Sequence, residues 1–311
     1  MSEAIAAMRE AFAELARGGV KLPPRLRMDA PAENGVALVM PCHSASQKLF
    51  SLKFITLFQD NPRRGLPLIQ STVLLSDGCT GMPLAVMDGA TLTSLRTGAA
   101  SGLATDLLAR PESATVAIFG AGVQARTQLE AVACVRRIQR ARVFDPNMES
   151  AARFATEMQQ QLGVEVACAT SPAEAADEAD IICTATTSPV PVFDDRDVKC
   201  GAHINAVGVF QPNMAEVPAA TVCRARVVVD HRQSALEEAG DLLMPLHGGL
   251  IGAEHFSTEL GEVVLGLKPG RTAANEITLF KSVGVAIQDL CAASRAFANA
   301  ERLGLGTKLQ W

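Results

Sequence analysis

The spacing of apolar residues changes near residue 113, and the change divides the chain into two parts. Before it, short apolar runs alternate with polar positions and end at turn formers such as Asp60-Asn61-Pro62 and Asp77-Gly78. This pattern predicts a mostly antiparallel sheet. The expected strands cover residues 35–40, 49–56 and 66–75, and helical spacing predicts helices over residues 3–17 and 91–108.

After residue 113, apolar runs rich in β-branched residues alternate with segments of helical spacing. This alternation is typical of a parallel sheet that helices cover on both faces. Asn147 and Ser171 are good N-cap residues, and they predict where two of the helices begin. The expected strands are 115–120, 140–145, 164–169, 180–186, 203–208 and 224–230, with helices over 122–136, 148–161 and 171–179.

A last helix is predicted over residues 281–303, and no new strand follows for it to cover. We therefore expect it to pack back on the first domain. The predicted fold class is α/β, with a Rossmann-type parallel sheet domain over residues 113–285 and a discontinuous α+β domain over residues 1–112 and 286–311.

Composition narrows the class of protein. The chain has 311 residues, of which 48% are hydrophobic and 20% charged, so it can bury two substantial cores. A net charge of -5, no Tyr and a single Trp argue against nucleic acid or an anionic membrane as a partner. The chain has no apolar run of about 18 residues, and its N-terminus does not resemble a secretory signal.

Cysteine and histidine usage points to a chain without metal. The eight cysteines form no C-x-x-C pair and several lie in apolar runs, so we expect free thiols in a reducing cytoplasm. The five histidines are scattered without the spacing of metal ligands, and no metal site is predicted.

The stretch AIFGAGVQARTQLE, residues 117–130, places a G-x-G-x-x-A pattern between a predicted strand and a predicted helix. Gly120 permits a tight turn, Gly122 lets a pyrophosphate approach the backbone, and Ala125 allows close packing of helix on strand. The N–H groups at the helix start attract an anion. In a βαβ series this pattern predicts a bound dinucleotide.

Asp145 ends the strand that follows the glycine loop. A carboxylate there can accept hydrogen bonds from the adenosine ribose and repels a 2′-phosphate, so it favours NADH over NADPH. The alternative interpretation is that Asp145 caps the next helix. Thr184, Ala185 and Thr186 end a later strand and are similar to the small polar residues that pass beside a dinucleotide; an ordinary strand-end loop is the alternative.

Seven segments, spread over nearly the whole chain, together have the pattern of a known family. They are LAVMDG (84–89), SLRT (94–97), GAGVQA (120–125), GAHINAVG (201–208), VDHRQSALEEAGD (229–241), ELGEVV (259–264) and TLFKSVG (278–284). In these segments the chain resembles the ornithine cyclodeaminase/mu-crystallin family. The resemblance implies a Rossmann domain, a substrate and dimerisation domain, a homodimer, and redox chemistry at an α-imino or α-amino acid.

The resemblance also extends the set of candidate residues. Asp230 is placed near the cofactor, with helix capping as the alternative, and Ser282 is placed near the nicotinamide. The full set of expected cofactor-binding residues is Gly120, Gly122, Val123, Gln124, Ala125, Asp145, Thr184, Ala185, Thr186, Val207, Gly208, Asp230 and Ser282.

Binding an α-imino acid requires a fixed cation for its carboxylate. Arg96 stands at the family's carboxylate-binding position, and either Arg25 or Arg27 is similar to a second carboxylate-binding arginine. Lys53 lies in the apolar strand LFSLKFITLF, where a lysine is costly unless it has a partner, and it matches the family's active-site lysine. We expect Lys53 to orient the substrate and to handle a proton.

Two positions depart from the cyclodeaminases of the family. Those enzymes have an acid where this chain has Leu38, and an Asp where this chain has Phe210. Without an acid to hold a distal amine, the site suits a substrate that is already cyclised, with Phe210 lining it. The chain therefore looks closest to the ketimine reductases.

The predicted function is NAD(P)H-dependent reduction of a cyclic ketimine carboxylate to proline or pipecolate. Arg96 and Arg25 or Arg27 would hold the carboxylate, and Lys53 would manage the proton. The alternatives are an ornithine cyclodeaminase, an alanine dehydrogenase, and a non-catalytic binding protein like mu-crystallin. Ring size and the direction of the reaction stay open.

Overall fold

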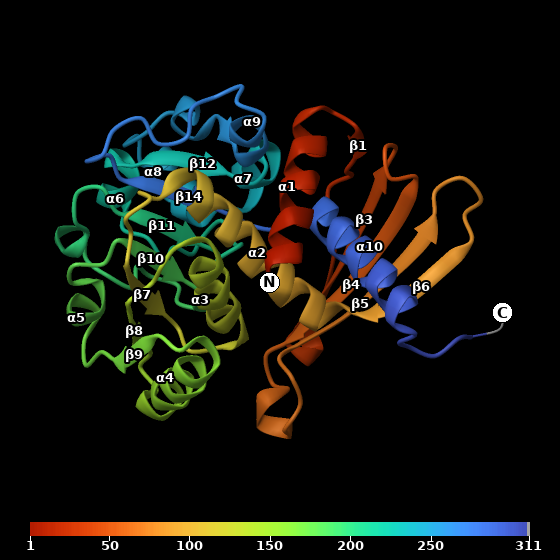
Figure 1. Ribbon diagram of the computed structural model, residues 1–311, viewed down its shortest axis with the longest axis horizontal. Helices are drawn as coiled ribbons and strands as arrows, with labels where there is room; N and C mark the ends of the chain where they lie inside the picture. Colours follow the sequence, from red (N-terminus) through yellow and green to blue (C-terminus); the bar gives the residue numbers. More distant parts are fainter. Residues whose placement is uncertain (310–311) are drawn as a thin grey trace. The chain divides into compact units, whose positions relative to one another are not determined.

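The computed structural model describes residues 1–309, and these divide into two compact units (Figure 1). Unit 1 comprises Met1–Ile5 and Thr97–Gly284, and unit 2 comprises Ala6–Arg96 and the chain from Val285 onward. The chain passes from one unit to the other three times: inside helix α1 (Ser2–Ala16), inside helix α2 (Gly89–Leu108), and after Gly284. The sequence instead predicts boundaries after residues 112 and 285.

Unit 1 is built on an eight-stranded sheet with the order β13-β12-β14-β11-β10-β7-β8-β9. All neighbouring strands in it run parallel. The predicted fold class, a Rossmann-type sheet domain with a second α+β domain, is confirmed. The strands are β7 (Thr115–Phe119), β8 (Arg140–Phe144), β9 (Glu165–Cys168), β10 (Ile181–Thr184), β11 (His203–Ala206), β12 (Arg226–Val229), β13 (Thr258–Glu259) and β14 (Thr278–Lys281).

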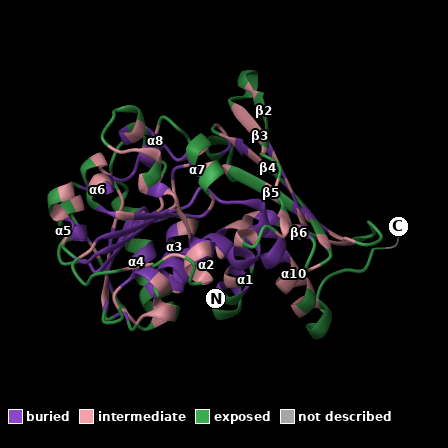
Figure 2. Ribbon diagram, turned by 90° about the horizontal axis from the view of Figure 1, so that it is seen from above, coloured by how far each residue is buried: buried purple, intermediate pink, exposed green. Residues whose placement is uncertain are grey.

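Alternate residues of these strands face two different cores. Val116 and Ile118 of β7 belong to a cluster with α3 and α4, and Ala117 and Phe119 belong to a second cluster on the opposite face. Burial on both faces explains why the strands are continuously apolar, and Figure 2 shows them mostly buried. The helices are α3 (Val123–Val135), α4 (Met148–Leu162), α5 (Pro172–Ala176), α6 (Ala219–Arg224), α7 (Arg232–Glu238), α8 (Gly240–His247) and α9 (Leu260–Val264).

The two predicted N-caps are confirmed. The side chain of Asn147 accepts from the Ser150 N–H at 3.1 Å, and Ser171 accepts from the Glu174 N–H at 3.1 Å.

The prediction of one helix over residues 281–303 was wrong at its start. Residues Thr278–Lys281 form β14, which pairs with β11 and β12 in the middle of the sheet, and helix α10 begins only at Ala286. The sequence concealed this strand because it is four residues long and ends in a lysine. Lys281 is fully buried and forms an ion pair with Asp241, and this contact makes the position possible.

Unit 2 contains an antiparallel sheet of six strands, in which β3 pairs with β1, β2 and β4. Helix α10 (Ala286–Leu303) packs against β3, β4 and β5 (Figure 1). The strands are β1 (Val20–Lys21), β2 (Leu26–Ala30), β3 (Gly35–Ser44), β4 (Leu49–Phe58), β5 (Ile69–Asp77) and β6 (Pro83–Asp88); helix α1 (Ser2–Ala16) is shared between the units.

Two further observations bear on the protein's class. Within residues 1–309, no helix combines the length and the apolar character that crossing a membrane requires. All eight cysteines lie in this range and are free thiols, three of them buried and three exposed.

Candidate functional site

The predicted glycine loop follows β7, at the point where the strand order of unit 1 reverses. The chain proceeds from β7 to β8 and β9 on one side, and then to β10 and β11 on the other side. Ligands of open parallel sheets bind at such a point, beyond the carboxyl ends of the strands. A cavity of about 710 Å³ lies here, lined by residues that include Gly120, Gly122, Asp145, Thr186, Ser188 and Val192.

Glycine is needed at the first two motif positions of the loop for two different physical reasons. Gly120 has a φ of +94°, and a Cβ on it would lie 2.6 Å from the Ala185 carbonyl oxygen. A Cβ on Gly122 would meet no protein atom within 4 Å, so the space above it is open to a ligand. Ala125 is fully buried against the sheet. Val123, exposed to 67%, and the half-buried Gln124 form the first turn of α3.

Asp145 is oriented by the loops on both sides of it. Its Oδ2 accepts from the Ala121 N–H at 2.9 Å, and its Oδ1 accepts from the Asn147 N–H at 2.8 Å. The carboxylate therefore lines the cavity in a fixed orientation, next to the glycine loop. Asn147, and not Asp145, is the N-cap of α4.

A buried carboxylate that the sequence did not single out joins two candidate cofactor loops. Glu216 accepts from the backbone N–H of Thr186 at 2.7 Å and from its hydroxyl at 2.8 Å. It also accepts from the N–H groups of Gly208 at 2.8 Å and Val209 at 3.0 Å. Burial raises the pKa of Glu216, although the charge of Lys281 opposes this. A Cβ on Gly208 would collide with Thr186, so only glycine fits there.

The same network continues below these loops. Lys281 donates to the Val209 carbonyl at 2.6 Å and pairs with Asp241 at 2.5 Å, while Asp241 accepts from the Glu216 N–H at 2.6 Å. Thr184 is fully buried, and its hydroxyl has no partner among residues 1–309.

The remaining predicted residues of unit 1 have protein partners. Asp230 is buried and accepts from the Ser282 hydroxyl at 2.7 Å and from the N–H groups of Val283 and Gly284. It therefore ties the end of β12 to the segment after β14. Val207 is half-buried after β11, and Phe210 packs against the apolar core of unit 1.

In unit 2, Lys53 lies on the buried face of β4 and is 2% exposed. The side chains of β4 alternate strictly, so that Leu52 and Phe54 are exposed while Ser51, Lys53 and Ile55 are buried. Lys53 therefore points to the buried face of the sheet and not to solvent. Met40, opposite Lys53 on β3, and Leu38 are buried as well.

A carboxylate on α10 pairs with both predicted cations. Asp289 Oδ2 lies 2.7 Å from Lys53 Nζ, and its Oδ1 accepts from Arg96 Nε at 3.0 Å. Arg96 Nη1 donates to Gln288 Oε1 at 2.8 Å. Arg96 is 5% exposed and Asp289 1%. Lys53 and Arg96, from different elements, are thus brought to one carboxylate.

The electrostatics of this cluster leave Lys53 able to titrate near neutrality. Burial lowers the pKa of Lys53 to about 8, while Asp289 raises it and Arg96 and Arg25 lower it. Burial raises the pKa of Asp289, but Lys53 and Arg96 together hold it below its ordinary value. At neutral pH the cluster thus contains an ammonium group, a guanidinium group and a carboxylate.

The structure distinguishes the two candidate arginines that follow the double proline. Arg25 is half-buried, and its charge is felt at Lys53. Arg27 is exposed on β2 and pairs with Asp29 at 2.7 Å.

Sequence reasoning missed Asp289, Gln288 and Glu216. One signal was present for the first two: the apolar run VGVAIQDLCAA, residues 283–293, is interrupted by a Gln-Asp pair. An acid at the buried start of a helix needs a cation, just as Lys53 in its apolar strand needs an anion. Nothing in the local pattern around Glu216 indicates its partners.

With this geometry established, comparison with known proteins identifies the family. The model of the ornithine cyclodeaminase/mu-crystallin family matches residues 1–302. The chain belongs to this family. The resemblance deduced from its motifs is thereby confirmed.

Three relatives match over the full length of the chain. A Δ1-pyrroline-2-carboxylate reductase of Bacillus cereus is 39% identical over 312 residues, which cover 100% of this chain and 96% of that protein. The solved structure of the Thermococcus litoralis Δ1-pyrroline-2-carboxylate reductase, in complex with NADH and L-proline, is 42% identical with a TM-score of 0.96 and covers 99% of this chain and 96% of its own. An archaeal alanine dehydrogenase dimer with bound NAD is 35% identical, with a TM-score of 0.94 and coverage of 100% and 95%.

Proposed function

We propose that this protein is a nicotinamide-dependent reductase of Δ1-pyrroline-2-carboxylate, with L-proline as the product. The observation that carries the proposal is the buried cluster of Lys53, Arg96 and Asp289, in a chain that matches a reductase binding NADH and L-proline along its whole length. Two cations and one carboxylate leave one net positive charge, which the carboxylate of such a substrate would neutralise. The six-membered homologue, Δ1-piperideine-2-carboxylate, is the alternative substrate.

The residues of unit 1 fit a dinucleotide. The open space above Gly122 and the fixed carboxylate of Asp145 belong to loops that line the cavity. The buried Thr184 hydroxyl lies at the end of β10, directly before the cavity-lining Ala185. These loops would hold the pyrophosphate and the adenosine ribose, with Val123, Gln124, Ala185, Thr186, Val207 and Gly208 beside the ligand. The bound cofactor supplies the hydride that reduces the imine carbon.

In unit 2, Arg96 would bind the substrate carboxylate. A guanidinium group has five N–H donors in a planar fork, more than its contacts with Asp289 and Gln288 use. Arg25 is the better candidate for the second arginine, because its charge acts on Lys53 while Arg27 is paired with Asp29. The buried Leu38 and Met40 of β3 would offer an apolar surface to the methylene groups of the ring. Phe210 stays a predicted apolar contact of the substrate.

Lys53 would supply the proton of the reaction. The imine nitrogen takes up one proton as its carbon takes up the hydride, and the ammonium group of Lys53 is the acid with a pKa closest to neutrality in the cluster. Lys53 then regains a proton from solvent, so that charge and protons balance.

We further propose NADH over NADPH, because Asp145 would repel a 2′-phosphate. An arginine could instead bind a 2′-phosphate, but the guanidinium group of Arg126 on α3 already has protein partners. It pairs with Glu157 at 2.5 Å and donates to the Ala121 carbonyl at 2.6 Å. The free thiols support a reducing compartment such as the cytoplasm.

A panel of substrates tests the proposal. Purified protein with NADH should consume the cofactor in the presence of Δ1-pyrroline-2-carboxylate and form L-proline. Consumption with pyruvate and ammonium alone would establish an alanine dehydrogenase instead. Release of ammonia from ornithine without net cofactor use would establish a cyclodeaminase, and no turnover of any of these substrates would leave a binding protein.

A further inference from the structure

The first turn of α10 contributes two adjacent buried polar side chains, Gln288 and Asp289, that contact the cations of this cluster. Gln288 is fully buried, and its Oε1 accepts from Arg96 Nη1 at 2.8 Å and from the Val285 N–H at 3.0 Å. The Gln288 N–H in turn donates to the Val285 carbonyl at 3.0 Å. Gln288 is therefore locked into the start of the helix, and its amide oxygen has one orientation.

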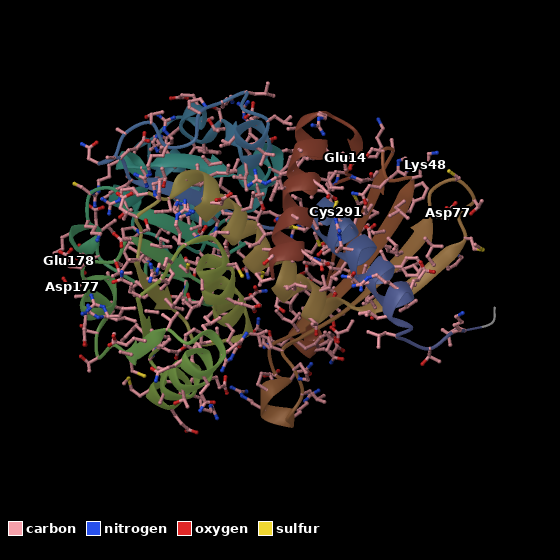
Figure 3. The ribbon with its side chains drawn as sticks, viewed as in Figure 1. Glu14, Lys48, Asp77, Asp177, Glu178 and Cys291 are labelled. Atoms are coloured by element: carbon pink, nitrogen blue, oxygen red, sulfur yellow. The ribbon has the colours of Figure 1, made fainter. Side chains whose placement is uncertain are left out.

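Asp289, the next residue, faces charged and titratable groups from several elements. Lys53 reaches it from β4 and Arg96 from α2, and the Cys42 thiol on β3 is within electrostatic range. Lys53 is in addition exposed to the charge of Arg25. Burial raises the pKa of Cys42, and it raises the pKa of Cys291, which lies three residues after Gln288 on α10, to about 12. Both thiols, of which Figure 3 labels Cys291, therefore stay neutral. Asp289 is thus the negative charge that these cations share.

Each of the two cations is held by a contact with Asp289, and Arg96 is held at a second point by Gln288. A flexible lysine and a flexible arginine otherwise lose their geometry by rotation, and two buried cations repel each other. A carboxylate between them removes both problems. We propose that Asp289 and Gln288 are positioning residues of the substrate site: Asp289 spaces Lys53 and Arg96 and keeps Lys53 protonated, and Gln288 fixes the plane of the Arg96 guanidinium.

This inference rests on the proposed function, but part of its test does not. In protein labelled with isotope-enriched lysine, NMR follows the Lys53 side-chain nitrogen, which Lys53→Arg identifies. Asp289→Asn should move the titration of Lys53 to lower pH by about one unit or more, because the opposite charge that favours its protonated form is gone. An unchanged Lys53 titration would overturn the role of Asp289, whether or not the protein reduces imines.

Kinetics then separate the two residues. In Asp289→Asn, the fall of kcat/KM at alkaline pH (the alkaline limb) should begin at a lower pH, by the same amount as the Lys53 titration shifts. The KM for the imine should rise about tenfold or more. Gln288→Met should raise that KM without moving the limb, and Gln288→Glu, which keeps an oxygen for Arg96 and Val285, should restore a KM near that of the wild type. Equal KM values in Gln288→Met and the wild type would contradict the role of Gln288.

Controls cover a loss of folding. Asp289→Glu retains the charge and should retain the limb, and Gln160→Glu, on the exposed face of α4, reports any effect of added charge alone. If Asp289→Asn does not fold, the Gln288 pair still tests how Arg96 is positioned. Binding of L-proline to the NADH-loaded variants, measured by calorimetry, gives a readout that does not require turnover. A wild type that binds L-proline but reduces no imine would remove the proposed function and leave the positioning roles testable.

Discussion

A lysine on the buried face of a strand can lower its energetic cost by losing its proton or by finding an anion, and Lys53 is between the two. Its pKa of about 8 reflects burial that favours the neutral form and Asp289 that favours the charged form. A group in this range can give up a proton at neutral pH and recover it. This single property connects the packing of β4 with the chemistry proposed for the site.

The pH dependence of the reaction follows from this value. Below about pH 8 Lys53 carries the proton that the imine nitrogen needs, and above it the proton is lost, so kcat/KM should fall as the pH rises through this range. Lys53→Met should lower kcat/KM by about 10²–10⁴-fold. Lys48→Met, at the exposed end of the β3–β4 hairpin (Figure 3), is the matched control. A rate that rises steadily through pH 9 would be incompatible with Lys53 as the acid.

Cofactor choice is a second prediction for one residue. Asp145→Ser should raise the KM for NADH about tenfold and lower that for NADPH, because it removes both a ribose acceptor and a charge that repels phosphate. Steady-state kinetics with both cofactors measure this, with the exposed Asp177→Ser as the control (Figure 3). A wild type that prefers NADPH would show that Asp145 does not set the choice.

At the residue scale, the sequence was informative where a single residue conflicts with its local pattern and so must have a special role. Lys53 in an apolar strand and the paired glycines could be recognised locally. Asp289 could not, because its partners Lys53 and Arg96 are far away along the chain and only folding brings them together.

At the scale of elements, the loops after β10 and β11 are joined through one carboxylate, which the later part of the loop after β11 supplies. Glu216 accepts four hydrogen bonds from Thr186, Gly208 and Val209, and Lys281 on β14 holds Val209 from below. The end of the sheet where the cofactor is proposed to bind is therefore stabilised by buried charges and not by apolar packing alone.

Glu216→Gln tests this arrangement. A carboxylate has two acceptor oxygens and an amide has one. Either the donors of Thr186 or the N–H groups of Gly208 and Val209 therefore lose their acceptor, at a cost of about 1–3 kcal/mol. The melting temperature should fall by several degrees and the KM for NADH should rise about tenfold, while kcat at saturating NADH changes little. Exposed Glu178→Gln is the control (Figure 3). A normal KM for NADH in a destabilised variant would mean that Glu216 supports the fold but not the cofactor loops.

Element prediction failed where tertiary contacts override the local pattern. The parallel strands and the N-caps of α4 and α5 followed from periodicity and cap residues. Strand β14 did not follow from the local pattern, because it has only four residues and ends in a lysine. A buried lysine is plausible there only once Asp241 is known to pair with its ammonium group.

At the scale of the whole molecule, the antiparallel sheet of unit 2 has one face that the described chain leaves exposed. Four of its outward side chains are large and apolar: Phe50 is 45%, Leu52 38%, Phe54 45% and Val86 54% exposed. An apolar face of this kind marks an interaction surface. The family resemblance of the sequence predicts a homodimer, and a second copy of this chain packed on this face would remove these side chains from water.

The double variant Leu52→Glu with Phe54→Glu should separate such a dimer into monomers, because it places charges in an apolar interface. Sedimentation velocity measures the mass, and Leu250→Glu, at an exposed apolar residue of unit 1, controls for the added charge. A wild-type monomer, or a double variant that stays dimeric, would exclude this face as the interface.

The architecture was the most predictable level. Alternation of strands and helices decided the parallel sheet, and the family motifs decided the second domain. The division inside α2 was not predictable, since a continuous helix gives no local sign that its two halves belong to different units.

The central claim is that the imine carbon of the substrate receives hydride from the nicotinamide while its carboxylate is held by this chain. NADH labelled with deuterium at the transferable position, incubated with the protein and Δ1-pyrroline-2-carboxylate, tests it most directly, with mass spectrometry of the product. The account predicts L-proline that carries one deuterium at its α-carbon. Proline without the label, or NADH that stays reduced while the imine is present, would contradict it.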